Sequence, residues 1–203
     1  MIRLYDYLPS GNGYKVRLLL TQLAIPFERI ELDIIKGETR TPEFLRKFPN
    51  GRIPAVELDD RDDKLLFESN AIITYFAEDT PFLSADRFER AQTLQWLFFE
   101  QYSHEPYIAS VRHLVIHPDV KDDRRQILDL MRRRGYDALA VMDSHLKSRE
   151  WFVGARYSIA DIALYAYTHV AGEGGFDLSG YTAIQTWLER VKSQPRHIPI
   201  TQS

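Results

Sequence analysis

The change of hydrophobic period along the chain limits its possible folds more than any other feature. Over residues 1–80, short strand-like runs alternate with segments of helical spacing such as Tyr14–Leu23. From Asp86 onward only helical spacing is present. A strand, a helix and a second strand in succession predict a parallel strand pair with a right-handed crossover. We therefore expect an α+β protein, with a small α/β domain over 1–79 and an all-α domain over 86–203.

Within the first domain, strands are expected at Ile2–Tyr5, Phe27–Asp33, Pro54–Leu58 and Leu65–Phe67, the last two joined by a polar turn over 59–64. Thr41-Pro42 should begin a short helix through Lys47, and Ser69 should cap the next one. The second domain should contain long helices over 88–117 and 119–148, a buried helix over 159–171 and a final helix over 184–191. On the first long helix, Ala91, Leu94, Phe98 and Tyr102 are in register. The inner face of the second is predicted to carry Ile127, Met131, Ala138, Val141, Met142 and His145.

Composition excludes several classes of protein. A formal net charge of −3 over 203 residues gives no electrostatic reason to expect nucleic acid or an anionic membrane as partner. We expect no signal peptide and no membrane span, and hence a cytoplasmic location. The count of zero cysteines excludes disulfides, thiolate metal sites and a cysteine nucleophile. His113 and His117 have zinc-compatible spacing, but no third ligand is evident, so no metal site is expected.

Three short motifs suggest local chemistry. Ser158 and Asp161 have the spacing of a capping box, which is a structural signal. Glu68-Ser69 stands where a strand gives way to a helix, so Ser69 and the helix N-terminus could bind a carboxylate while Glu68 accepts from an ammonium group. Pro54 cannot donate to a sheet, and a cis Ile53-Pro54 bond would expose the backbone of Ile53 to an extended peptide ligand. Each motif alone is compatible with a purely structural role.

Their combination is more specific. The order β-α-β-α, N-G-R-I-P-A-V, hairpin, E-S-N-A-I and then a helical half with S-I-A-D-I-A resembles the cytosolic glutathione transferase family over nearly the whole chain. The resemblance implies a thioredoxin-like first domain, a helical second domain, glutathione as co-substrate, a role in detoxification and a homodimer. The bacterial, cysteine-free members of the Nu-like or theta-like type are the most similar.

The resemblance also implies roles for individual residues. Ile53 and Pro54 match the segment that pairs with the cysteinyl backbone of glutathione, and Glu68 and Ser69 match the positions that hold its γ-glutamyl end. A less specific match assigns Thr39 and Arg52 to the glycyl end. Another assigns three residues of the helical domain to the pocket for the electrophile: Tyr102, Tyr107 and Arg112. Bundle core or a dimer contact is an equally good interpretation of the second set.

The thiol donor is expected just after the first strand, in P-S-G-N-G. Ser10 is the principal candidate, and Asn12 could assist or replace it. An ungapped alignment with insect-type serine enzymes instead puts Gly11 at the serine position. Tyr5 and Tyr7 are a third possibility, although core packing suits both better.

We expect an enzyme that conjugates glutathione to small electrophiles. The main alternative is a glutathione-dependent disulfide reductase that uses no protein cysteine. Family members with a threonine and an asparagine in this loop catalyse that reaction, and Ser10 and Asn12 are similar to those two positions. A second alternative is a non-catalytic glutathione-binding regulatory or carrier protein.

Overall fold

A computed structural model describes residues 1–58 and 64–202. The chain divides into two compact units, Met1–Glu78 together with the C-terminal segment that begins at Pro195, and Asp79–Gln194. The sequence-based division assigned residues 86–203 to the helical domain, whereas the structure groups the end of the chain with the first unit. The predicted polar turn over 59–64 lies outside the described residues, apart from its last residue.

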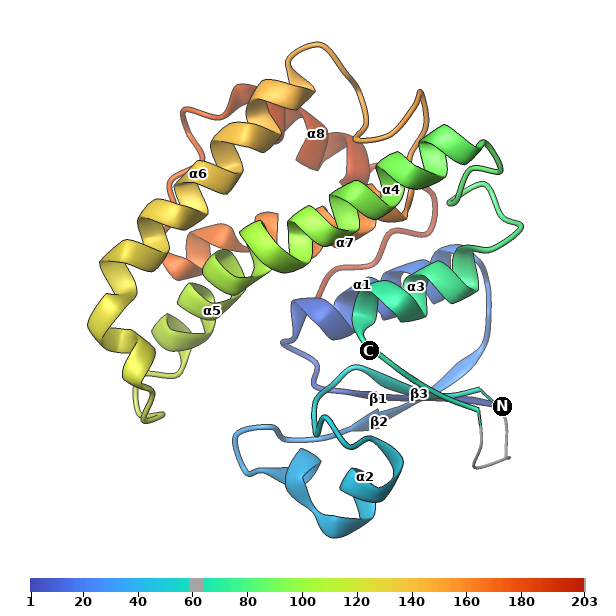
Figure 1. Ribbon diagram of the computed structural model, residues 1–203, viewed down its shortest axis with the longest axis vertical. Coiled ribbons are helices and arrows are strands. Elements are labelled where there is room, and N and C mark those ends of the chain that lie inside the picture. Colours follow the sequence, from blue (N-terminus) through green and yellow to red (C-terminus); the bar gives the residue numbers. More distant parts are fainter. Residues whose placement is uncertain (59–63, 203) are drawn as a thin grey trace. The chain divides into compact units, whose positions relative to one another are not determined.

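The first unit is built on a four-stranded sheet with strand order β2-β1-β3-β4 (Figure 1). The strands are β1 (Ile2–Asp6), β2 (Phe27–Glu31), β3 (Ala55–Glu57) and β4 (Leu65–Phe67). β1 and β2 are parallel, as the β-α-β succession predicts, and β3 is antiparallel to both β1 and β4.

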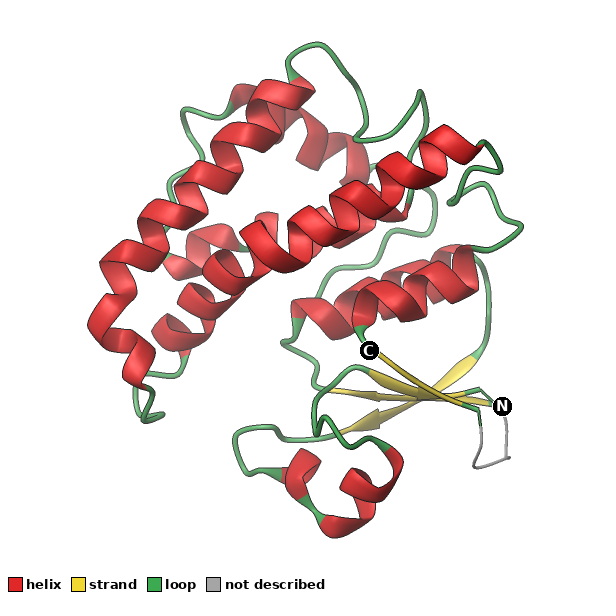
Figure 2. Cartoon of the chain, viewed as in Figure 1, coloured by secondary structure: helices red, strands yellow, loops and turns green. Residues whose placement is uncertain are grey.

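Helices cover both faces of this sheet (Figure 2). Helices α1 (Gly11–Gln22) and α3 (Ser69–Ala77) pack together on one face, and the short α2 (Pro42–Lys47) covers the other, after a 3₁₀ turn at Glu38–Arg40. Under α2, Phe44, Phe48 and Ala55 form a buried cluster that Tyr5 joins through edge-on ring contacts. On the other face α1 is buried from Gly13 to Leu20, including two charged residues, Lys15 and Arg17.

The second unit is helical. Its elements are α4 (Arg87–Phe99), a π-helical turn (Glu100–His104), α5 (Glu105–Ile116), a 3₁₀ turn (Asp123–Ile127), α6 (Leu128–Leu146), α7 (Ile159–Thr168), a 3₁₀ turn (Ala171–Gly174) and α8 (Thr182–Lys192). All ten residues of α7 are buried. The other helices pack around it, as its nearly uniform apolar character predicts.

The capping box of α7 also makes tertiary hydrogen bonds, to the chain before the helix and to α8. Asp161 Oδ2 accepts from the backbone N–H and the hydroxyl of Ser158, at 3.0 and 3.1 Å. Asp161 Oδ1 accepts from the backbone N–H of Phe152 at 3.2 Å and from Trp187 Nε1 of α8 at 2.9 Å. Burial raises the pKa of Asp161 to about 6, although these hydrogen bonds oppose the shift.

Two predicted long helices are interrupted. The helix expected over 88–117 contains Pro106, which has no N–H to donate, and the chain forms a π-helical turn just before it. The helix expected over 119–148 begins only at Leu128, because Asp122 caps a 3₁₀ turn and Arg125 donates to carbonyls in the preceding turn.

The apolar residues in register on the first long helix reach the surface of the single chain. Leu94 and Phe98 of α4 and Tyr102 of the π-helical turn are 45%, 68% and 83% exposed, while Trp96 and Leu97 are buried.

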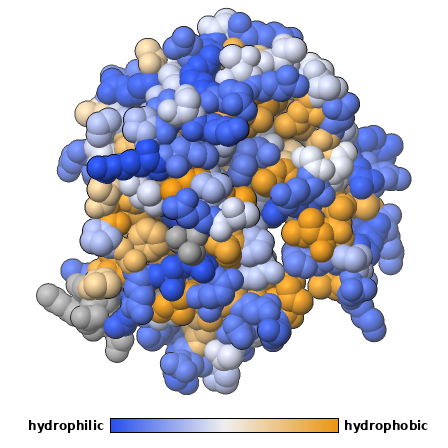
Figure 3. Space-filling view, turned by 180° about the vertical axis from the view of Figure 1, so that it is seen from behind, coloured by the Kyte–Doolittle hydropathy of each residue, from blue (hydrophilic) through white to orange (hydrophobic). Residues whose placement is uncertain are grey.

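On the predicted inner face of the second long helix, Met131, Ala138 and Met142 are buried, whereas Ile127 and Val141 are each 49% exposed. Apolar side chains also reach the surface in separate patches on the face seen in Figure 3. Among the described residues, no helix has the length and apolar character needed to cross a bilayer.

Candidate functional site

Ser10 ends the loop after β1 and is the N-cap of α1. Its extended backbone conformation allows Oγ to accept from the Gly13 N–H at 3.3 Å. The serine hydroxyl therefore lies at the positive end of a twelve-residue helix. Because Oγ uses a lone pair in this bond, its proton stays available for donation to a ligand.

Asn12 and Ser69 connect the beginnings of α1 and α3. The Ser69 hydroxyl is 5% exposed and donates to Asn12 Oδ1 at 3.3 Å. The ammonium group of Lys15 donates to Ser69 Oγ at 3.2 Å and to Asn70 Oδ1 at 3.3 Å. The Lys15 side chain is completely buried, so this cation lies directly behind the two helix N-termini. The arrangement brings together Asn12 and Ser69, which the sequence analysis assigned to the thiol and to the γ-glutamyl end of glutathione.

Glu68, not Ser69, is the N-cap of α3, so the predicted cap is shifted by one residue. Its φ of +69° lies in a region that residues other than glycine rarely adopt. The Glu68 carboxylate is on the surface and accepts from the side-chain amide of Asn50 at 3.1 Å. Since Ser69 is the first residue of the helix, its hydroxyl and the free N–H groups of the first turn lie together.

The remaining residues predicted to bind glutathione lie in the same unit. The Ile53-Pro54 peptide bond is cis and precedes β3, and Ile53 packs against the aromatic cluster under α2. Arg52 is exposed, whereas Thr39 is only 4% exposed within the 3₁₀ turn before α2. Burial makes Thr39 a less accessible contact than the sequence alone indicated.

The alternative tyrosine donor is occupied elsewhere. The Tyr5 hydroxyl donates to the buried carboxylate of Glu57 at 2.8 Å, on the α2 side of the sheet. Burial, together with the hydrogen bond and the charge of Glu57, raises the pKa of Tyr5. Tyr7 accepts the backbone N–H of Ser10 through its carbonyl at 2.7 Å and so helps to form the turn. The side-chain contact of Tyr5 favours a structural role for that tyrosine.

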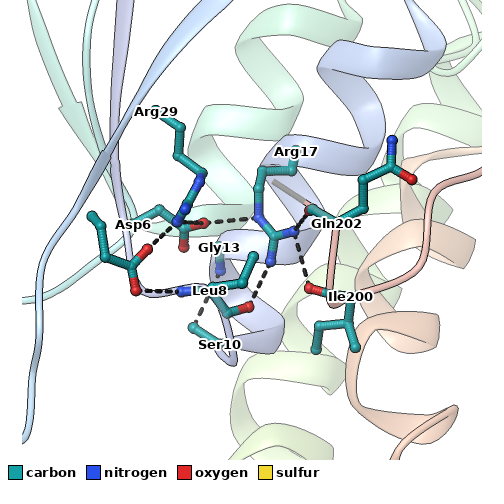
Figure 4. Close-up of polar contacts among 9 residues, drawn as sticks. Asp6, Leu8, Ser10, Gly13, Arg17, Arg29, Ile200 and Gln202 are labelled. Carbon is teal, nitrogen blue, oxygen red and sulfur yellow. Dashed lines mark hydrogen bonds and ion pairs between the residues drawn. The ribbon is translucent and has the colours of Figure 1, made fainter.

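Two buried charges beside the loop were missed by the sequence analysis. The guanidinium of Arg17 and the carboxylate of Asp6 are both fully buried and form an ion pair at 2.8 Å (Figure 4). Burial raises the pKa of Asp6 and lowers that of Arg17, while each opposes the shift of the other. The signal in the sequence was Arg17 standing directly between the apolar residues Val16 and Leu18 of a helix.

In the second unit, the residues predicted to line an electrophile pocket differ widely in exposure. Tyr102 lies in the π-helical turn and is 83% exposed, and Tyr107 is half-buried at the start of α5. Arg112 is 7% exposed and holds Glu173 through two contacts of 2.7 Å. Because the guanidinium is buried and already paired with the half-exposed Glu173, a structural role for Arg112 is favoured.

The rings of His113 and His117 lie 4.8 Å apart, as their spacing on one helix predicts. Burial and the neighbouring His117 both lower the pKa of His113. Over residues 1–58 and 64–202, no group of three or more potential ligands has the arrangement of a metal site.

Comparisons with known proteins agree with this architecture. The family model described as "Glutathione S-transferase, N-terminal domain" matches residues 1–78, and the corresponding C-terminal domain matches residues 99–195. The chain belongs to the glutathione S-transferase family. The disulfide-bond oxidoreductase YfcG of Escherichia coli K12 is 36% identical over 201 residues, which cover 96% of this chain and 92% of YfcG.

Solved structures of transferases match over almost the whole chain. The glutathione S-transferase of Pseudomonas fluorescens Pf-5 is 49% identical with a TM-score of 0.94, and 99% of each chain is covered. The transferase URE2P6 of Phanerochaete chrysosporium, solved with oxidized glutathione, is 27% identical with a TM-score of 0.85, covering 96% of this chain and 92% of that one. These glutathione transferases share the same arrangement of a thioredoxin-like domain and a helical domain.

Proposed function

We propose that this family member is a glutathione transferase that joins the thiolate of glutathione to small electrophiles. The observation that carries the proposal is the hydrogen bond from Ser69 to Asn12, because it joins the N-termini of α1 and α3. A donor for the thiol and a binding site for a free amino-acid end are therefore close neighbours. Glutathione has both of these groups, and a fungal transferase with the same fold was solved with its oxidized form.

Ser10 is the proposed thiolate donor. A free thiol has a pKa of about 8.5, so only a few per cent is ionised near neutral pH. The Ser10 hydroxyl accepts from the Gly13 N–H and can donate its own proton to the sulfur. Together with the positive end of α1, this bond should lower the pKa of the thiol by about one or two units. The thiolate then attacks the electrophile, its electron pair forms the new carbon–sulfur bond, and the leaving group departs with the displaced pair.

The γ-glutamyl end is assigned to the beginning of α3. The Ser69 hydroxyl and the first N–H groups of the helix are suitable donors for a carboxylate. The nearby ammonium of Lys15 supports this assignment, since it adds positive charge behind Ser69. Glu68 is positioned at the surface to accept from the glutamyl ammonium group. Ile53 is proposed to pair with the peptide backbone, and Arg52 and Thr39 are weaker candidates for the glycyl end.

Disulfide reduction with glutathione is the second candidate. The observation that favours it is the name of the relative from E. coli, a disulfide-bond oxidoreductase that is 36% identical. The chain has no cysteine, so any such reaction must use glutathione thiols alone. A glutathione thiolate would attack one sulfur of the disulfide and displace the other as a thiolate, which leaves a mixed disulfide. The thiolate of a second glutathione would then attack the glutathione sulfur of the mixed disulfide, which forms oxidized glutathione and displaces the second substrate thiolate.

Kinetics with an aryl halide and with a small disulfide distinguish the two reactions. We expect turnover of the aryl halide, and turnover of the disulfide alone would support the second candidate instead. Tight glutathione binding by calorimetry without activity on either substrate would indicate a non-catalytic binding protein.

A matched set of variants tests the thiolate donor. Ser10→Ala should raise the pKa of the bound thiol by about one unit and lower kcat/KM about tenfold near pH 6.5. Asn12→Ala measures how much the side-chain amide of Asn12 contributes to lowering the thiol pKa. Ser193→Ala, at the end of α8, is the control because its hydroxyl donates to a helix carbonyl in the second unit. An unchanged thiol pKa in Ser10→Ala would contradict the assignment.

A homodimer is the proposed assembly. Leu94 and Phe98 of α4 and Tyr102 of the π-helical turn form an exposed apolar row, and such rows are typical of interfaces. A second copy of the chain is the occupant that the family resemblance implies. Tyr107, half-buried on α5, is the stronger candidate of the set for the electrophile pocket. The cytoplasmic location stays a prediction from the sequence.

A further inference from the structure

The loop that presents Ser10 is held from two sides at a single residue, Leu8 (Figure 4). The backbone N–H of Leu8 donates to Glu31 Oε1 of β2 at 3.1 Å. The carbonyl of Leu8 accepts from Arg17 Nη2 at 2.7 Å. The next backbone bond, from the Ser10 N–H to the Tyr7 carbonyl at 2.7 Å, closes the turn around Leu8. The position of Ser10 therefore depends on both of the partners of Leu8.

Arg17 joins this loop to two distant parts of the chain. Its Nε donates to Asp6 Oδ2 at the end of β1, at 2.8 Å. Its Nη1 donates to the carbonyl of Ile200 at 3.1 Å and also to the carbonyl of Gln202. A guanidinium has five N–H donors in a rigid plane, so these contacts determine its orientation closely.

The C-terminal segment is attached to the same face of α1. One turn before Arg17, the Tyr14 hydroxyl donates to the carbonyl of Ile198 at 2.6 Å. Tyr14 and Arg17 are three residues apart and so lie on one side of the helix. Both side chains are fully buried, and both donate to backbone carbonyls of the segment; the Tyr14 hydroxyl also contacts Nε2 of His197 at 3.2 Å. The segment thus supplies acceptors that Arg17 could not obtain from water.

We infer that Arg17 is a positioning residue for Ser10, and that the segment Ile198–Gln202 braces Arg17 against the carbonyl of Leu8. This inference rests on the proposed function, in which Ser10 donates to the thiol of glutathione. Arg17 does not touch the thiol; it acts through the Leu8 carbonyl and the turn that ends at Ser10. Loss of the guanidinium removes the donor of the Leu8 carbonyl and the hydrogen-bonded partner of Asp6, which leaves Asp6 with the longer 3.8 Å contact with Arg29. The turn then relaxes, and the Ser10 hydroxyl moves away from the place that the sulfur occupies.

The ultraviolet absorbance of the bound thiolate, measured against pH with glutathione at saturation, gives the pKa that the inference concerns. A merely structural arginine would change stability without changing this pKa. We expect Arg17→Gln to raise the pKa by about one unit, comparable to Ser10→Ala, and Arg17→Lys to restore part of the difference. The double variant Ser10→Ala/Arg17→Gln should raise the thiol pKa no further than Ser10→Ala alone, because both changes act through the Ser10 hydroxyl.

Arg125→Gln is the matched control. Arg125 also donates to several backbone carbonyls, those of Leu114, His117 and Val120, but it lies in the second unit. The Arg125→Gln variant should lower stability and leave the thiol pKa at the wild-type value. A raised pKa in Arg17→Gln with a wild-type pKa in Arg125→Gln supports the inference.

A milder variant answers the question if Arg17→Gln does not fold. Glu31 is 44% exposed, so Glu31→Ala removes the acceptor of the Leu8 N–H without opening the core. A raised thiol pKa in Glu31→Ala supports the inference that the two hydrogen bonds of the Leu8 backbone position Ser10. Wild-type pKa values in both Arg17→Gln and Glu31→Ala, with a raised value in Ser10→Ala, overturn the inference alone. A wild-type value in Ser10→Ala overturns the proposed role of Ser10 instead.

Discussion

Gly13 is the position where a single methyl group should do the most damage to the first unit. A Cβ added there would lie 1.6 Å from Asp6 Oδ1 and 2.5 Å from Asp6 Cγ. Both distances are far below van der Waals contact. Asp6 is fully buried and paired with Arg17, so its short side chain has no free space to enter. Gly13→Ala must therefore displace the carboxylate and break the ion pair.

The expected cost follows from two opposing effects. Breaking a buried ion pair by removing one partner costs about 3 to 5 kcal/mol. Replacing a helical glycine with alanine returns about 1 kcal/mol through backbone entropy and helix propensity. The net loss in the free energy of unfolding is therefore about 2 to 4 kcal/mol. For a chain of this length, such a loss lowers the melting temperature by roughly 5 to 15 °C.

Urea unfolding followed by circular dichroism measures this loss directly. Gly172→Ala is the matched control, because a Cβ at Gly172 meets no atom within 4 Å and its φ is not positive. We expect the control to change the free energy of unfolding by no more than about 0.5 kcal/mol.

A Gly13→Ala variant within about 1 kcal/mol of wild type would refute the reasoning. It would mean that the Asp6 carboxylate can leave Arg17 at little cost. A loss confined to activity, with unchanged stability, would lead to the same conclusion.

Other measurements test separate parts of the structure. Because burial raises the pKa of Asp161 to about 6, the folded chain holds a proton that the unfolded chain releases at lower pH. The free energy of unfolding should thus fall as the pH rises from about 4 to 6, by on the order of 3 kcal/mol, and Asp161→Asn should lose this slope in urea titrations. Lys15→Met should weaken glutathione binding about tenfold in calorimetry, since the donor to Ser69 is lost, and wild-type affinity would contradict that role. Phe98→Glu on the exposed row of α4 should convert a dimer to a monomer in light scattering, whereas an unchanged mass would exclude this row as the interface.

Much of the fold could be predicted because its signals are local. The capping box at Ser158 and Asp161 lies within four residues, and the apolar run that follows it leads directly to a buried α7. The strands of the first unit follow from short alternating runs, and the parallel pairing of the first two follows from the β-α-β succession. The beginning of α3 was predicted to within one residue, because residues that favour helix N-termini are recognisable.

The sequence was least informative where a local pattern is compatible with two tertiary arrangements. The periodicity of α4 correctly groups Leu94, Phe98 and Tyr102 on one side, but it does not say whether the same chain covers that side. The opposite side, with Trp96 and Leu97, is the one that packs inward. Pro106 also gave a clear local signal, and the predicted long helix passed over it.

Local chemistry was thus enough to predict the two kinds of domain, the helix that begins at Ser10 and the absence of any cysteine reaction. Only the tertiary structure reveals what holds Ser10 in place. Arg17 and Ile200 are 183 residues apart, and Arg17 recognises carbonyl groups, which every residue has. A backbone acceptor leaves no trace in side-chain composition or periodicity. Its partner is therefore decided by how the chain packs, because packing alone brings a buried guanidinium and those carbonyls together.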